Sequence, residues 1–145
     1  MEIPPQILKK ILKPGTAFLF DQETFKGRKP HFFVVLNHNP QTDELLLMVN
    51  ATTKVDNRRF EMELTGVPEE TLVVVKAGEC SFLIKESAFD CNFPTIRSVD
   101  DLVLKFQQKA LKMVGEISED LLSKLRFGVL QSPMVDDDTK KIIIK

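Results

Sequence analysis

Basic side chains are concentrated in one short segment, residues 26–31, where they could stabilise the negative charge of a phosphate. The segment reads Lys-Gly-Arg-Lys-Pro-His, and its candidate site residues are Lys26, Arg28, Lys29 and His31. Because its glycine and proline favour a turn, we expect the cations to lie close together on a loop. Cations held in this way stabilise a phosphate oxygen whose charge grows during phosphoryl transfer. The alternative is an ordinary solvated hairpin loop.

Two hydroxyl groups follow the apolar run of residues 45–49. Thr52 and Thr53 leave this predicted strand together. Hydroxyls at a strand end can bind a phosphate or orient a nucleophile, and they can also stabilise a turn through hydrogen bonds to the backbone. The sequence leaves both roles open.

Two adjacent guanidinium groups come next, on Arg58 and Arg59. A pair of guanidiniums can clamp a phosphate through bidentate hydrogen bonds, or it can pair with neighbouring acids such as Glu61 and Glu63. We expect salt pairing, with phosphate binding as the alternative.

A second polar segment, residues 85–90, places Lys85, Ser87 and Asp90 in one predicted loop, which could complete a polar site or only close the sheet.

His31 and His38 could exchange protons near neutral pH as a general acid and base. Seven residues separate these histidines, and no acidic ligands accompany them at metal-binding spacing. We therefore predict no metal site.

Composition narrows the class of protein. The chain has 145 residues, 43% of them hydrophobic, and a formal net charge of −1, which is unlike proteins that coat nucleic acid non-specifically. It lacks the G-x-x-x-x-G-K-S/T, G-x-G-x-x-G, G-x-S-x-G and H-E-x-x-H signatures, so we expect no cofactor. Cys80 and Cys91 form no C-x-x-C pair, and we expect both to be buried thiols.

The elements that must position these residues follow from hydrophobic periodicity. Residues 6–13 have helical spacing and end at Pro14 and Gly15. Short apolar runs bounded by turn residues then predict strands at residues 17–20, 32–36, 45–50, 71–76 and 81–84, with a sixth at 59–64, where apolar and charged residues alternate. Several short strands without intervening helices favour an antiparallel sheet that curls into a small barrel.

The pattern changes after Pro94. Ser98 resembles a helix N-cap, and the apolar spacing that follows predicts a helix up to Gly115. Ser118 caps a second predicted helix, so residues 98–131 should form a helical hairpin. Residues 136–138 read as a solvated loop, and residues 142–144 as a last strand or a tail. We therefore expect an α+β, mainly β, single domain over residues 1–145, with a barrel core at 14–90 and the helical hairpin as an extension.

The sequence also bears on location. The apolar runs are far shorter than the roughly 18 residues that a membrane-spanning helix needs. The first residues, Met-Glu-Ile-Pro-Pro, lack the basic stretch and apolar stretch of a secretory signal. We expect a cytoplasmic protein without membrane contact.

Three segments taken in order resemble the PemK/MazF-like toxins of bacterial type II toxin-antitoxin systems. They are Pro-Gly-Thr at 14–16, Gly-Arg-Lys-Pro-His followed by Phe-Phe-Val-Val-Leu at 27–36, and Leu-Leu-Met-Val-Asn-Ala-Thr-Thr at 46–53. In that family a glycine opens the first strand, a basic residue and a proline introduce a strand ending in Val-Val, and the third strand ends in Thr or Ser. The resemblance spans about residues 14–90.

The resemblance implies an SH3-like barrel, a homodimer, an antitoxin protein as partner and metal-independent endoribonuclease activity on single-stranded RNA. The matching positions are Arg28 or Lys29, which would stabilise the phosphorane, and Thr52 with Thr53, which would hold the phosphate or the 2′-hydroxyl. His31 is a candidate for proton transfer. Lys85 and Ser87 approach the same face without matching a family motif.

This chain also departs from the family pattern, because its basic residues are crowded together and its helical tail is long. The alternative is therefore a non-catalytic protein-interaction module on the same fold. Such a module would bind a protein partner through the helices of residues 98–130 or the acidic residues 136–138.

Overall fold

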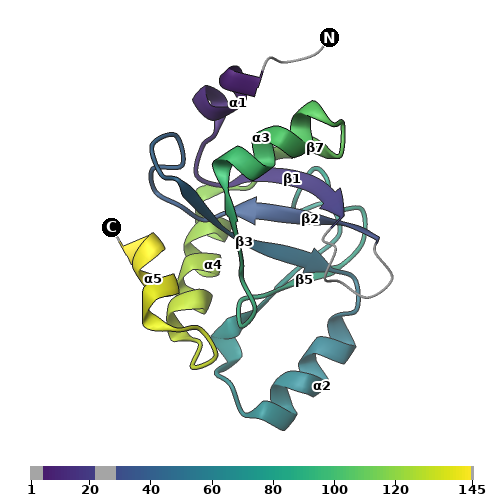
Figure 1. Ribbon diagram of the computed structural model, residues 1–145. Coiled ribbons are helices and arrows are strands. Elements are labelled where there is room, and N and C mark those ends of the chain that lie inside the picture. Colours follow the sequence, from purple (N-terminus) through teal and green to yellow (C-terminus); the bar gives the residue numbers. More distant parts are fainter. Residues whose placement is uncertain (1–4, 22–28, 145) are drawn as a thin grey trace.

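The structure is a computed structural model that describes residues 5–21 and 29–144 (Figure 1). Seven strands in these residues form one sheet, and every pairing is antiparallel. The order is β4-β5-β3-β2-β1-β7, and β6 pairs with the first half of β3. The strands are β1 (Thr16–Asp21), β2 (Pro30–Val35), β3 (Leu45–Thr52), β4 (Leu72–Val75), β5 (Ser87–Asp90), β6 (Thr95–Ser98) and β7 (Leu111–Glu116).

Helices cover both faces of this sheet (Figure 1). They are α1 (Pro5–Ile11), α2 (Val55–Thr65), the 3-10 turn η1 (Glu69–Thr71), α3 (Val99–Gln107), α4 (Glu119–Gln131) and α5 (Asp137–Ile144). Because side chains alternate along a strand, β3 contributes Leu47 and Val49 to a core under α4 and α5, and Leu46 and Met48 to a second core under α1 and α3. Strand β3 is therefore the centre of the fold.

The expectation of an α+β, mainly antiparallel fold is confirmed. The described strands do not close into a barrel, because the sheet order ends at β4 on one side and at β7 on the other and no pairing between described residues joins them. The sheet is therefore open over the part of the chain that the structure describes.

The predicted strand at residues 59–64 is wrong, because these residues lie in α2. The alternation suggested a half-buried strand, yet Phe60 and Leu64 are 61% and 71% exposed, and Val55 is the buried residue of this helix. Arg, Glu, Met and Leu are good helix formers, so local propensity favours the helix where no buried face competes. Helix α2 ends at Gly66, whose positive φ of 69° lets its N–H donate to the carbonyl of Met62.

The strand predicted at residues 81–84 is also wrong, and the predicted loop at 85–90 contains β5 instead. Residues 80–83 form a turn in which the N–H of Leu83 donates to the carbonyl of Cys80. Strand β5 pairs with β4 on one side and with β3 on the other, so tertiary pairing compensates for its polar sequence.

The predicted helical hairpin at residues 98–131 does not form. Ser98 and Ser118 do cap helices, as expected, since their side chains accept hydrogen bonds from the N–H groups of Asp101 and Leu121. The first helix, however, ends at Gln107, and β7 pairs with β1 at the edge of the sheet. Backbone pairing with β1 outweighs the helical spacing of residues 111–116, so an edge strand of the sheet separates α3 from α4.

The C-terminal residues form α5, where we expected an acidic loop followed by a strand or a tail. Asp136 accepts a hydrogen bond from the N–H of Thr139 at 2.8 Å, which starts the helix. Ile143 is buried in the core under α4, and its carbonyl lies 3.0 Å from Nε2 of His38. His38 thus holds α5 in place and takes no part in the predicted polar site.

Candidate functional site

A groove of about 320 Å³ opens where β3 ends, and we call it the β3 groove. It lies between the end of β3, the start of β5, residue 32 of β2 and the loop of residues 82–85. Its lining residues are Phe32, Ala51, Thr52, Thr53, Phe82, Leu83, Ile84, Lys85 and Ser87. Four of the side chains predicted to bind substrate, from two separate segments of the chain, therefore meet in one groove.

The register of the sheet explains why these segments meet. Ala51 of β3 lies opposite Phe89 of β5, and Thr52 lies opposite Ala88. Thr53 directly follows Thr52 and Ser87 directly precedes Ala88, so both lie at the same end of this antiparallel pairing. The hydroxyls that leave β3 and the polar segment that enters β5 are thus neighbours because β3 and β5 pair.

The three hydroxyls of the β3 groove differ in their hydrogen bonds. Ser87 is 2% exposed, and its hydroxyl donates to the carbonyl of Lys85 at 3.0 Å. Oγ1 of Thr52 accepts a hydrogen bond from the N–H of Lys54 at 3.2 Å, which is the turn-forming role that the sequence left open. Thr53 is exposed, and within the described residues its hydroxyl has no hydrogen-bond partner. Thr53 is therefore the hydroxyl that can meet a ligand without breaking an existing contact.

Lys85 supplies the positive charge of the groove. Its side chain is exposed, and no described residue forms an ion pair with its ammonium group. An ammonium without a partner attracts an anion without first losing a salt bridge, and it is a point charge suited to phosphate. Lys85 and Thr53 thus give the lining of the groove one cation and one hydroxyl that can contact a phosphate.

The predicted basic segment is described only in part. Lys26 and Arg28 lie outside the described residues, whereas Lys29 is exposed directly before β2. His31 is the second residue of β2, and its Nδ1 lies 2.7 Å from the carbonyl oxygen of Lys29. Because Phe32 lines the β3 groove and neighbouring residues of a strand face opposite sides, His31 points to the other face of the sheet. The structure does not bring His31 to the β3 groove.

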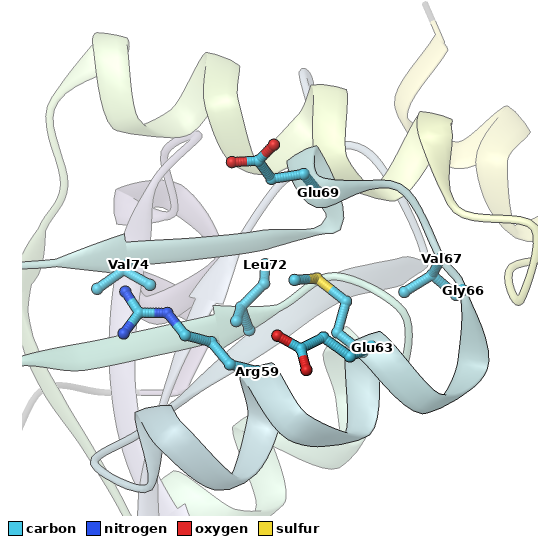
Figure 2. Close-up of a pocket in the computed structure, with 8 residues that line it drawn as sticks. Arg59, Glu63, Gly66, Val67, Glu69, Leu72 and Val74 are labelled. Carbon is cyan, nitrogen blue, oxygen red and sulfur yellow. The ribbon is translucent and has the colours of Figure 1, made fainter.

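The two arginines form salt bridges on α2, as the sequence favoured. Arg58 pairs with Glu61 at 3.0 Å and Arg59 with Asp56 at 3.6 Å, whereas Glu63 has neither as its partner. Figure 2 shows Arg59 and Glu63 beside a different pocket, of about 500 Å³, between α2 and β4. Neither arginine lines the β3 groove.

Sequence reasoning missed two apolar residues of the groove, Phe82 and Ile84. They belong to the short apolar run of residues 81–84, which predicts a strand. In the structure Ile84 is 86% exposed, and the ring of Phe82 lies 5.2 Å from that of Phe32, centroid to centroid. No signal in the sequence distinguishes such a loop from a strand.

Both cysteines are free and buried, as predicted. Burial, with a smaller contribution from the charge of Asp90, raises the pKa of the Cys91 thiol to about 12. Burial also raises the pKa of the Cys80 thiol, and Glu79 adds to this effect. Neither thiol is an activated nucleophile, since nucleophilic cysteines have a lowered pKa.

Among the described residues, no cluster of three or more His, Cys, Asp or Glu side chains is arranged to hold a metal ion. None of the helices described here has the length and apolar character needed to cross a membrane.

Comparison with known protein families and with curated proteins finds no match for this chain.

Proposed function

We propose that the protein is an endoribonuclease that cleaves single-stranded RNA without a metal ion, on an SH3-like fold of the PemK/MazF type. One observation carries the proposal: Thr52, Thr53, Lys85 and Ser87, which come from two separate segments, line one groove at the end of β3. An exposed cation and an exposed hydroxyl at the same rim are groups that hold a phosphodiester.

The reaction needs charge stabilisation more than a dedicated nucleophile, because RNA carries its own. The 2′-hydroxyl attacks the adjacent phosphorus and loses its proton, and the P–O5′ bond breaks as O5′ gains a proton. The products are a 2′,3′-cyclic phosphate and a 5′-hydroxyl end. Lys85 balances the charge that grows on the non-bridging oxygens, and the hydroxyl of Thr53 donates a hydrogen bond to one of them.

The β3 groove contributes binding and charge in this proposal. Its described side chains include no histidine and no carboxylate, so proton transfer falls to groups outside the groove lining. Arg28 and Lys29 are the cations that the family resemblance assigns to the phosphorane. Arg28 lies outside the described residues, and His31 takes no part in this reaction because it faces the other side of the sheet.

Cleavage of a fluorescent single-stranded RNA in the presence of EDTA tests the proposal. We expect wild-type protein to cut the RNA, and Lys85→Ala and Thr53→Ala to lower kcat/KM by about 100-fold, the usual effect of removing one contact to a developing oxyanion. Lys112→Ala is the matched control, because Lys112 is an exposed lysine on β7 without an ion-pair partner among the described residues. Intact RNA with the wild-type protein contradicts the proposal.

A protein-interaction module is the second candidate, and the surface of α2 favours it. Phe60 and Leu64 lie one helical turn apart and are both more than half exposed. This candidate requires that RNA stays intact and that Phe60→Ser with Leu64→Ser changes the association state of the protein in sedimentation. The helices α3 and α4, which the sequence suggested for this role, bury most of their apolar residues in the two cores, although Leu104 and Phe127 are about half exposed.

A further inference from the structure

We propose that the β3 groove holds a single nucleobase of the RNA strand by stacking, beside the phosphate at Lys85 and Thr53, and that it does not distinguish which base it holds. This inference rests on the proposed function and adds a base-binding subsite to it. Three features of the groove support it: apolar walls, a small volume and polar groups confined to the rim.

The walls of the groove are apolar. Phe32 and Phe82 are half-buried, and their rings are tilted by 45° with centroids 5.2 Å apart. Leu83 is 5% exposed and forms part of the lining, so the groove is mostly carbon. A flat aromatic ligand would cover this carbon surface, and base–aromatic stacking is the contact that single-strand-binding proteins use for this purpose.

Ile84 is the most exposed large apolar side chain among the described residues, at 86%. It stands at the rim of the groove, next to Lys85. An isoleucine this exposed adds almost nothing to the stability of the chain, because its apolar area stays in water. A base seated against Phe82 would bury this apolar area. Ile84 would then stabilise the bound base, although it does not stabilise the folded chain.

The volume limits the ligand to one unit of the strand. Small-molecule sites range from about 300 to 1,000 Å³, and the β3 groove, at about 320 Å³, is at the lower end. A single base fits this space, whereas a stack of several bases does not. The neighbouring nucleotides must therefore lie outside the groove.

The polar groups of the groove are few, and two of them already form hydrogen bonds to the backbone. Ser87 already donates its hydroxyl hydrogen to a carbonyl, and Thr52 already accepts from the backbone. Thr53 and Lys85 are at the exposed rim. Base identity is read through hydrogen bonds to the base edge, and stacking alone tolerates all four bases because each has a π-face. We therefore expect weak base preference at this position.

Binding of a strand that cannot be cut separates this inference from the cleavage proposal. The probe is a single-stranded 2′-deoxy oligonucleotide with one 2-aminopurine, whose fluorescence falls when it stacks. We expect quenching by wild-type protein at one position of the strand. An abasic site there should raise Kd by about 10-fold, the effect of losing one stacked base, while exchange among the natural bases changes Kd less than about 3-fold.

Two variants connect the signal to the groove. Ile84→Ser and Phe82→Leu should each weaken binding and reduce quenching, and Ile84→Ser should leave folding unchanged because its side chain is exposed. Leu104→Ser is the matched control, since Leu104 is a 49% exposed leucine on α3. Equal binding of the abasic strand, unchanged quenching in Ile84→Ser, or a strong preference for one base at that position overturns the inference.

The cleavage assay tests the proposed function independently of the base-binding subsite. If RNA is cut with dependence on Lys85 but the abasic strand binds equally well, the cleavage proposal stands and the base subsite is wrong. If RNA stays intact while quenching depends on Ile84, the base subsite stands and the cleavage proposal is wrong.

Discussion

Gly128 lies where α4 comes closest to the rest of the protein, and replacing it by alanine should destabilise the fold. A Cβ at this position would lie 2.7 Å from Sγ of Cys91, 2.8 Å from the carbonyl oxygen of Glu70 and 3.1 Å from Cβ of Cys91. The first two distances are far below van der Waals contact. Because one of these atoms belongs to the backbone, the methyl group cannot be accommodated by a side-chain rotation alone.

Two opposing effects determine how much Gly128→Ala lowers the free energy of unfolding. Alanine is favoured over glycine in a helix interior by about 1 kcal/mol, which stabilises the variant. Overpacking a tight site costs about 1–3 kcal/mol, and a clash with backbone places Gly128→Ala near the upper value. We expect a net loss of about 2 kcal/mol, which lowers Tm by roughly 6 °C for a domain of this size.

Urea unfolding of wild type and Gly128→Ala, with equal m-values, measures this loss. Ser123→Ala is the control for helix propensity, because Ser123 is exposed on the same helix. In the double variant Cys91→Ala/Gly128→Ala the sulfur is gone, so the combined loss should be smaller than the sum of the single losses by about 1 kcal/mol. A Gly128→Ala protein as stable as wild type or more stable refutes the close approach of α4.

Two further predictions concern buried polar groups. Because the folded pKa of Cys91 is about 12 and the unfolded value is near 9.0, the unfolded chain releases its thiol proton first as the pH rises. The contribution of this thiol to the free energy of unfolding should therefore be constant below about pH 9 and fall above it by up to about 1.4 kcal/mol per pH unit. The free energy of unfolding should fall less steeply above pH 9 in Cys91→Ala than in wild type, and parallel curves contradict the burial of this thiol. Arg126 donates hydrogen bonds to the carbonyls of Leu36 at 2.7 Å and Asn37 at 3.2 Å, so Arg126→Met should cost about 2 kcal/mol in urea unfolding by leaving both carbonyls without this donor. Lys124→Met, which breaks only an exposed salt bridge, should change stability by less than about 1 kcal/mol, and a similar loss in both variants speaks against the Arg126 contacts.

Local signals in the sequence predicted the parts of the fold that local chemistry controls. Ser98 and Ser118 cap their helices because the capping bond lies within one turn of the chain. The apolar runs of β1, β2 and β3 were recognisable because each strand supplies the buried cores with consecutive apolar residues. These features need no information about distant residues.

The errors have a common physical cause, which is that pairing partners decide between helix and strand. The apolar spacing before Gly115 fits a helix, and only the free edge of β1 makes residues 111–116 a strand. The alternation in α2 fits a strand, and only the absence of a buried face leaves it as a helix. Neither condition can be read from the segment itself.

In the candidate site, too, local features could be predicted from the sequence and long-range pairing could not. The sequence identified Thr53 and Lys85 as separate polar features, but their meeting depends on the pairing of β3 with β5. For Arg58 and Arg59 the sequence favoured salt pairing over phosphate binding, and both arginines form local salt bridges on α2. In the apolar part of the groove, Phe82 is half-buried against the core, whereas Ile84 is exposed, and the apolar run of residues 81–84 does not distinguish the two.

The central claim is that the β3 groove holds an RNA phosphate while the neighbouring 2′-hydroxyl attacks it. The most direct measurement uses a fluorescent oligonucleotide in which all sugars are deoxyribose except one, incubated with wild-type protein and with Lys85→Ala in EDTA. We expect one cut, on the 3′ side of the single ribose, with a 2′,3′-cyclic phosphate end detected by mass spectrometry, and about 100-fold slower cutting by the variant. An intact strand, a cut at a deoxyribose, or equal rates for the two proteins would contradict it.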